Sequence, residues 1–253
     1  MRIVAIIPAR MASTRFPGKP LVKIHGHSMI EHVYCRTKCS KLINEVYIAT
    51  CDHEIADEVK RFRGKSIMTS PNHVRGTDRV AEAAKKIDAD LIINVQGDEP
   101  TVDPGILDDA IIHMRKKKEI QCLTLISHIK EWDHFVNKDI VKVTFDKEKK
   151  ILYFSRQPIP TYSSNNFKIA HKQIGIYLIH KDLLLKFAQW NETPLEKIEK
   201  VDLLRFLENG CSVYSFLGKD MISVDNPEDL SFVELTLSRD PLFLILFKQI
   251  DKS

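Results

Sequence analysis

The chain is short of the features that mark a secreted, zinc-stabilised or membrane protein. Its five cysteines are odd in number and form no C-x-x-C pair, which argues against a disulfide framework or a zinc site and indicates a reducing cytoplasm. No apolar stretch reaches the ~20 residues that a membrane helix needs, and the chain enters a predicted core strand without a signal peptide. We therefore expect a cytoplasmic protein with no membrane association.

An excess of one charge sign is also missing. The 38 lysines and arginines nearly balance the 34 acidic residues, so the formal net charge is +4, and the positive residues are interleaved with acidic ones. The densest basic run, Arg115 to Lys118, ends a predicted helix, where cations suit the helix dipole. No basic stripe alternates with aromatic residues. We expect no nucleic-acid partner.

The two common glycine-rich phosphate motifs are absent, yet the N-terminal segment is typical of a phosphate site. An apolar strand at 3–7 turns into the loop 8–21, which carries Arg10, Arg15 and Lys19. Arginine offers a planar fork of donors to phosphate oxygens and lysine a compact charge. Loops that follow parallel strands are also where open α/β sheets bind ligands. Residue types alone leave an alternative, in which these cations are solvated surface charges and bind no phosphate.

Strand and helix patterns alternate along the first 120 residues. The run Leu91 to Val95 has no polar alternation, as expected for a strand buried on both faces of a parallel sheet. Further strands are predicted at 45–50 and 66–68, and helices at 28–42, 53–61, 78–87 and 106–114, with Thr77 capping the third. This alternation predicts an α/β fold with a doubly wound, mostly parallel sheet.

From Ile120 the pattern changes to short strands separated by polar turns. Strands are predicted at 122–127, 141–145 and 151–154, with residues 146–150 as a hairpin connection. Helices follow at 181–189 and 194–208, then a strand at 211–216 and a helix from Pro227. We expect one domain, 1–253, with an inserted β-rich subregion at about 120–162. The apolar tail from Pro241 should pack on the body or on a partner subunit, whereas His25, His27 and His32 are expected at the surface or at a helix start.

Two distant carboxylates could hold a metal ion. Asp98 comes just after the buried strand, and Asp225 comes just before a predicted helix. Mg²⁺ is commonly held by one or two carboxylates together with substrate phosphates, so these residues and the basic loop would form a nucleotide site. The alternative is that Asp225 or Asn226 merely caps the helix and that Gly97 marks a turn.

Six collinear blocks resemble the 3-deoxy-manno-octulosonate cytidylyltransferases, or CMP-KDO synthetases, over roughly residues 1 to 233. The blocks are PARMASTRFPGKPL at 8–21, GTDR at 76–79, NVQGDEP at 94–100, YFSR-x-x-IP at 153–160, GIY at 175–177 and VDNPEDL at 224–230. The resemblance implies that CTP and an acidic eight-carbon sugar react to give the CMP-sugar and pyrophosphate, as part of lipopolysaccharide biosynthesis. It also implies a homodimer, for which we expect the inserted strands to form the interface.

The resemblance assigns roles on the nucleotide side of the site. Arg10, Arg15 and Lys19 would hold the triphosphate, with Lys19 the most important cation, and Asp98 and Asp225 would bind Mg²⁺. The residues expected over the cytosine are Ser70 and the segment 73–79, which includes Arg75 and Gly76.

On the sugar side, the resemblance is incomplete. It implies that Arg156 pairs with the sugar carboxylate and that Gln96 and Tyr177 bond the sugar hydroxyls. Gln96 is assigned to the nucleotide side as well. Three expected sugar contacts are changed, from His to Gln173, from Glu to Asp202 and from Gln to Leu203, although Gln173 and Asp202 keep polar groups that can bind the sugar. Because changed polar contacts can switch substrates, we expect KDO or a modified KDO such as an amino sugar. A catalytically silent relative that binds nucleotide or sugar is the alternative class.

Overall fold

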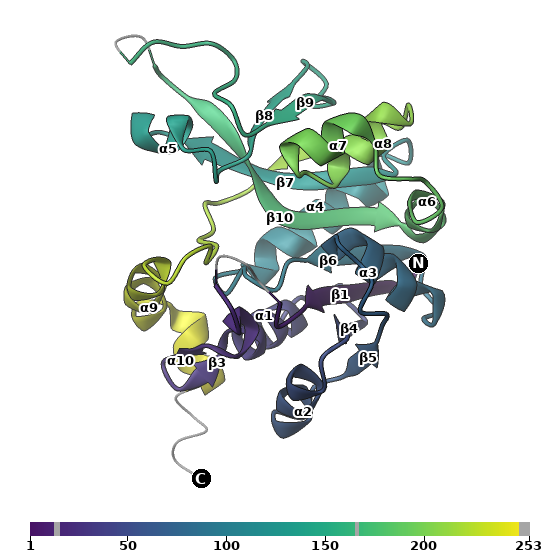
Figure 1. Cartoon of the computed structure of the whole chain (residues 1–253), viewed down its shortest axis with the longest axis vertical. Helices are drawn as coiled ribbons and strands as arrows, with labels where there is room; N and C mark the ends of the chain where they lie inside the picture. Colours follow the sequence, from purple (N-terminus) through teal and green to yellow (C-terminus); the bar gives the residue numbers. More distant parts are fainter. Residues whose placement is uncertain (13–15, 165–166, 248–253) are drawn as a thin grey trace.

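One sheet organises the chain in the computed structural model, which describes residues 1–12, 16–164 and 167–247 (Figure 1). Its main path runs β11-β7-β10-β6-β1-β4-β5. β10 is antiparallel to both neighbours, and the other pairings along this path are parallel. The predicted mostly parallel sheet is confirmed. The strands are β1 (Ile3–Ala9), β4 (Glu45–Thr50), β5 (Ser66–Met68), β6 (Leu91–Val95), β7 (Cys122–Ile129), β10 (Ala170–His180) and β11 (Tyr214–Leu217).

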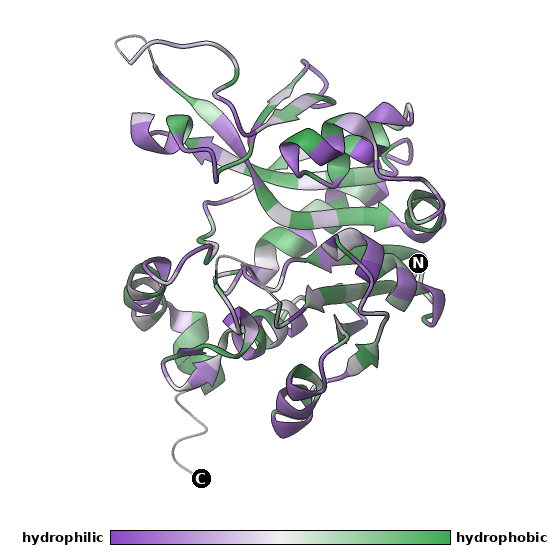
Figure 2. Cartoon of the chain, in the orientation of Figure 1, coloured by the Kyte–Doolittle hydropathy of each residue, from purple (hydrophilic) through white to green (hydrophobic). Residues whose placement is uncertain are grey.

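Helices cover both faces of the sheet, so the doubly wound prediction is also confirmed. On one face Val33, Val59 and Leu107 bring α1 (Met29–Lys38), α2 (His53–Arg61) and α4 (Pro104–Lys116) into one apolar core. On the other face lie α3 (Gly76–Lys85), α6 (Lys181–Phe187) and α8 (Leu203–Glu208). Figure 2 shows apolar residues along the central strands and polar residues on the outer sides of helices such as α2. Burial of these apolar side chains is the main favourable term in folding.

The predicted hairpin is present and joins the same sheet. β8 (Lys142–Phe145) and β9 (Ile151–Ser155) are antiparallel, and β8 also pairs with β10. The Asp146 carboxylate accepts hydrogen bonds from the amides of Glu148 and Lys150, both at 2.9 Å, which closes the turn. In Figure 1 this hairpin and α5 (Trp132–Val136) lie toward the top of the molecule, near the start of β10.

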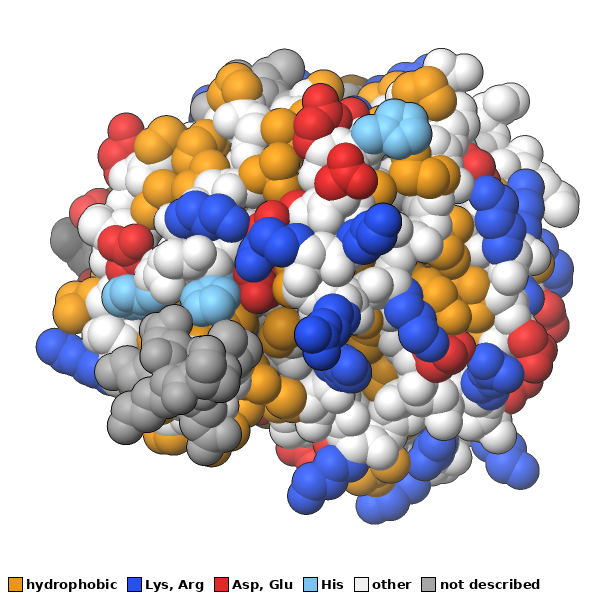
Figure 3. Space-filling view, turned by 90° about the horizontal axis from the view of Figure 1, so that it is seen from below, with side chains coloured by type: hydrophobic (Ala, Val, Ile, Leu, Met, Phe, Trp, Pro, Cys, Tyr) orange, Lys and Arg blue, Asp and Glu red, His pale blue; other side chains and the backbone are white. Residues whose placement is uncertain are grey.

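The C-terminal helices pack on the N-terminal region, as predicted for the apolar tail. Phe243 and Phe247 of α10 (Pro241–Phe247) are buried with residues of α9 (Asp229–Ser238), β2 (Lys23–Ile24) and the start of α1, beside β3 (His27–Ser28). Of the two alternatives predicted for His32, the surface was wrong, because its side chain is fully buried against both phenylalanines, and the helix start was right, because it lies in the first turn of α1. Figure 3, seen from below, shows lysines and arginines interspersed with acidic and apolar side chains on this face.

Two other local predictions were wrong, and one strand was largely missed. The predicted helix at 194–208 is divided into α7 (Pro194–Glu199) and α8 because Lys200 adopts the left-handed conformation. Thr77 does not cap α3; Arg75 holds that position, and the Thr77 hydroxyl accepts a bond from Asn94. The sequence patterns did not predict most of β10.

Among the described residues, no helix is both long and apolar enough to cross a bilayer.

Candidate active site

Two cavities meet at Asp98, beyond the carboxyl ends of β1 and β6. The first has a volume of about 280 Å³ and the second about 370 Å³, and Asp98 lines both. β1 and β6 run side by side and parallel, so the segments that leave them reach the same edge of the sheet. The approach is close: a Cβ atom on Gly97 would lie 2.8 Å from the Pro8 carbonyl oxygen, which explains the need for glycine there.

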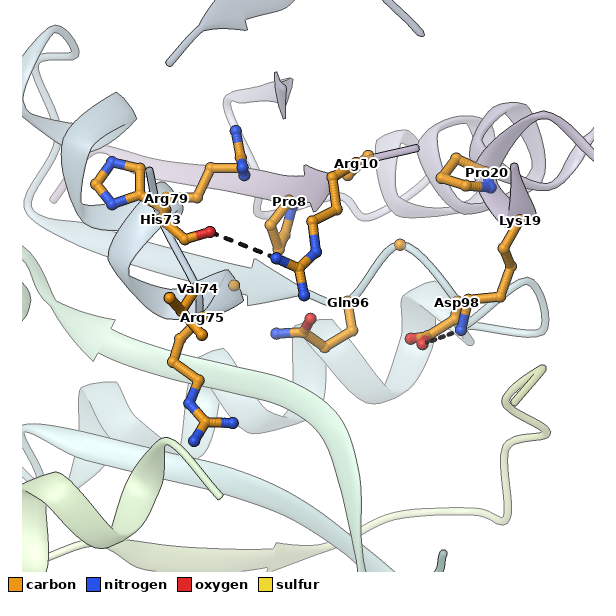
Figure 4. Close-up of a pocket in the computed structure, with 13 residues that line it drawn as sticks. Pro8, Arg10, Lys19, Pro20, His73, Val74, Arg75, Arg79, Gln96 and Asp98 are labelled. Carbon is orange, nitrogen blue, oxygen red and sulfur yellow. Dashed lines mark hydrogen bonds and ion pairs between the residues drawn. The ribbon is translucent and has the colours of Figure 1, made fainter. Parts of the chain in front are cut away.

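Basic residues line the first cavity. Arg10, Lys19, Arg75 and Arg79 all contribute, together with Gly76 and Gln96. Figure 4 shows the Arg10 guanidinium in the space between His73 and Gln96, while the end of Arg75 points toward α7. There the Arg75 guanidinium pairs with Glu192 at 2.6 Å. The cavity is therefore suited to a polyanion, as the resemblance predicts for Arg10 and Lys19.

Lys19 connects the loops that carry the two predicted metal ligands. It lies in η1 (Lys19–Leu21), and its Nζ donates to Asp98 Oδ2 at 2.6 Å and to the Val224 carbonyl at 2.8 Å. The Val224 amide in turn donates to the Asp98 carbonyl at 2.9 Å. These bonds place Asp225 next to the Asp98 loop, and both aspartates line the second cavity.

The capping alternative for Asp225 and Asn226 is not observed. Glu228 occupies the N-cap of α9, and Asp229 Oδ2 accepts bonds from the amides of Asp225 and Asn226 at 2.7 and 2.8 Å. Within the described ranges, no group of three or more His, Cys, Asp and Glu side chains could hold a metal. A pair of carboxylates fits Mg²⁺ when substrate phosphates complete its shell, so the donor set fits a nucleotide-bound ion.

Buried polar groups line the second cavity. Tyr177 and Gln173 reach it from β10, and Gln173 Nε2 is buried with no partner among the described residues. Burial, followed by the charge of Asp202, raises the pKa of Tyr177 well above its usual value. Burial also raises the pKa of Glu99 to about 7, with the Asp98 charge acting in the same direction. Sequence reasoning missed Glu99, although it stands inside the NVQGDEP block.

The other two changed positions lie away from the cavities. Asp202 Oδ2 accepts a bond from the Thr77 amide at 3.2 Å, at the start of α3. Leu203 is fully buried in the apolar core on that side of the sheet. Of the three departures from the family pattern, Gln173 is the one on a cavity wall. A different sugar would therefore contact Gln173 rather than Leu203.

Three predicted ligands stand apart from the cavities. Arg156 lies behind the wall of the second cavity, where its guanidinium donates to the carbonyls of Lys138, Asp139 and Glu199 at 3.1, 3.0 and 2.8 Å. Ser70 lies outside both linings, and its amide donates to Glu82 at 2.9 Å. Arg15 falls outside the described residues. The substrate contacts assigned to these residues remain predictions.

A basic cavity and paired carboxylates at the edge of a mostly parallel sheet define a nucleotidyltransferase. The family model for cytidylyltransferases matches residues 4–220. The 3-deoxy-manno-octulosonate cytidylyltransferase of Geobacter metallireducens is 45% identical over 251 residues, covering 94% of this chain and 99% of the relative. That of Thermodesulfovibrio yellowstonii is 42% identical over 255 residues, covering 94% and 99%.

Solved structures agree. A CMP:2-keto-3-deoxy-manno-octonic acid synthetase complexed with CTP is 35% identical, with a TM-score of 0.87 and coverage of 94% of this chain and 99% of that one. A cytidylyltransferase from Leptospira borgpetersenii, 19% identical with a TM-score of 0.66 and coverage of 100% and 94%, shares the fold. The chain belongs to the 3-deoxy-manno-octulosonate cytidylyltransferase family, which confirms the resemblance.

Proposed function

We propose that the chain transfers CMP from CTP to the anomeric hydroxyl of a 3-deoxy-2-ulosonic acid, KDO, and releases pyrophosphate. The observation that carries this proposal is the contact of Lys19 with Asp98 and the Asp225 loop, at the junction of the two cavities. A nucleotide in the first cavity and a sugar in the second would present the α-phosphorus and the hydroxyl to each other at that junction. Such positioning is the larger part of phosphoryl-transfer catalysis.

The cations of the first cavity take the triphosphate. Arg10 and Lys19 face the space where the phosphates would lie, and negative charge builds on the leaving pyrophosphate as its bond to the α-phosphorus breaks. Fixed positive groups stabilise that charge more in a partly enclosed site than in water. Arg79, Gly76 and Gln96 line the same cavity, and we place the nucleoside against them.

Asp98 and Asp225 are proposed to hold Mg²⁺ together with the triphosphate. When bound, the ion would neutralise phosphate charge and polarise the attacking hydroxyl. The like charges of the two aspartates repel each other, and Lys19 offsets this repulsion through its bond to Asp98. The reaction should stop when EDTA removes the ion and resume when Mg²⁺ is added in excess.

The deciding experiment is pyrophosphate release with purified protein, CTP and a panel of ulosonic acids. We expect turnover with CTP and KDO and none when UTP or ATP replaces CTP. Turnover of an amino-KDO, with none of KDO, would keep the reaction class and change the sugar, as the altered Gln173 position allows. No pyrophosphate from any acid would contradict the proposal.

A silent binding protein is the competing function. Asp98→Asn separates the two, because the substitution keeps the side-chain size and removes a metal ligand. For an enzyme we expect CTP binding to persist while turnover falls at least about 100-fold. Sugar binding that proceeds unchanged in a protein without turnover would favour the silent alternative.

We also infer a homodimer and a cytoplasmic location. Exposed apolar residues such as Leu152 and Val136 within the inserted subregion support an interface there. All five cysteines are free thiols, which suits a reducing compartment. Light scattering should give twice the chain mass, and Leu152→Glu should reduce it; a monomeric wild type would contradict the dimer.

A further inference from the structure

The second cavity is strongly acidic for a site that is to take an anionic sugar. Its lining includes six carboxylic acids, which are Asp98, Glu99, Asp139, Asp220, Asp225 and Asp229. Lys172 is the one lysine or arginine among the described residues on that lining. A carboxylate that enters low-dielectric surroundings needs a cation as its partner, since an unpaired charge there is costly.

Arg156, the partner implied by family resemblance, is committed elsewhere. Its guanidinium donates to the carbonyls of Lys138 and Asp139, and the neighbouring Lys142 Nζ donates to those of Asn137 and Ile140, both at 2.7 Å. The four consecutive carbonyls of residues 137 to 140 therefore all accept hydrogen bonds from these two cations. Arg156 and Lys142 hold the 137–140 loop, of which Asn137, Asp139 and Ile140 line the cavity, whereas Arg156 itself is not on the lining.

Lys172 already binds a carboxylate on the lining of the second cavity. Its Nζ lies 2.8 Å from Asp220 Oδ1, which also accepts a bond from the Ser127 hydroxyl at 3.0 Å. The Lys172 side chain is 21% exposed, whereas that of Asp220 is 65% exposed. An ion pair with one solvated partner contributes little to stability, so a ligand can replace Asp220 at small cost.

We propose that Lys172 is the specificity-determining cation that binds the carboxylate of the sugar acid, with Asp220 as the counter-ion that the substrate displaces. The inference rests on the proposed function and deepens it, because it names the residue that distinguishes an acidic sugar from a neutral one. Arg156 is then a positioning residue for the cavity wall.

The test compares two inert ligands in the presence of CTP. These are the 2-deoxy form of the sugar acid, which lacks the attacking hydroxyl, and its carboxamide, which lacks the charge. In wild type we expect the acid to bind about 10- to 100-fold more tightly than the carboxamide, the range for a charged hydrogen bond. Lys172→Gln should bring this ratio close to one, whereas Arg156→Gln should preserve it. Collapse of the ratio in Arg156→Gln and its persistence in Lys172→Gln would overturn the proposal.

Two further variants keep the test decisive. Asp220→Asn removes the competing carboxylate, so it should tighten binding of the acid several-fold and leave the carboxamide unchanged; equal effects on both ligands would count against the proposal. Lys219→Gln is the matched control, because Lys219 is 76% exposed and pairs with Asp103 outside the cavity. CTP binding reports whether each variant is folded. Pyrophosphate release by wild type tests the proposed function separately, so that its failure and the failure of the Lys172 assignment remain distinguishable.

Discussion

At the scale of single residues, the site forms because the backbone brings charged residues that are distant in the sequence close together in space. Asp98 and Asp225 are 127 positions apart by their numbers, and the bond from the Val224 amide to the Asp98 carbonyl makes them neighbours. Both could be predicted because each stands at the end of a recognisable element. Lys172 could not, because a lysine within a strand usually belongs to a solvated face. Glu99 was hidden for a similar reason, since nothing in the sequence indicates that its carboxyl is buried.

Lys19 is the residue whose loss should affect catalysis most. In Lys19→Gln we expect turnover to fall about 100- to 1000-fold, because a fixed positive charge is removed from the triphosphate site and Asp98 loses its partner. Steady-state pyrophosphate release measures the effect. Lys23→Gln is the control, since Lys23 is 51% exposed and pairs with Glu58 away from the cavities. A fall of less than about 3-fold in Lys19→Gln would contradict the assigned role.

At the scale of elements, the strands with continuous apolar runs were predictable, whereas β10 was not. Strands such as β4 and β6 are buried and flanked by turn residues, so their limits were predicted to the residue. β10 starts with Ala170, His171, Lys172 and Gln173, whose mixed polarity follows from a cavity on one side and β8 on the other. The division between α7 and α8 depends on one left-handed residue, Lys200, and a non-glycine residue gives no signal for it.

Arg205 holds α8 to two other helices. Its guanidinium pairs with Glu196 of α7 at 2.7 Å and with Asp78 of α3 at 2.8 Å, and Glu196 is fully buried. Arg205→Leu leaves that buried carboxylate without its main partner, so we expect a loss of about 3–5 kcal/mol in the free energy of unfolding. Denaturant unfolding gives the value.

A control variant distinguishes the loss of the Arg205 bridge from the loss of any surface charge. Lys219→Leu removes a 76% exposed lysine from an ion pair with Asp103 and should cost less than about 1 kcal/mol. Arg205→Leu combined with Glu196→Gln should recover part of the loss. Equal effects of the Arg205 and Lys219 substitutions would refute the bridging role.

At the scale of the whole molecule, the fold class and its two covered faces were predictable, but the docking of the C-terminal helices on the first fifty residues was not. An apolar tail must be covered, yet its sequence does not say by what. The partner is an aromatic and histidine cluster in which His32 contacts Phe243 and Phe247. This long-range contact gives the chain a defined acid sensitivity.

Burial lowers the pKa of His32 from 6.5 to about 4. Below pH 6.5, His32 is therefore protonated in the unfolded chain while it stays neutral in the native one. Protonation stabilises the unfolded state, so this residue's contribution to stability is lost as pH falls from about 6.5 to 4. Over that range the loss from this group reaches about 3 kcal/mol. Chemical unfolding of wild type and His32→Gln across the range should show the wild-type advantage shrinking toward low pH. A difference that stays constant with pH would disprove this account.

The reversed direction of β10 has a consequence for how this enzyme family can change its substrate. Because β10 runs against its neighbours, its first half, not a loop after its end, reaches the catalytic edge of the sheet, and Gly175 lies against Gln96 and Glu99 there. Gln173 and Tyr177, which line the second cavity, therefore belong to a paired strand, with a register shift against β7 between them. With the sugar placed in this cavity as proposed, selectivity depends on side chains along one strand, so exchanging them can change the substrate while every loop keeps its length.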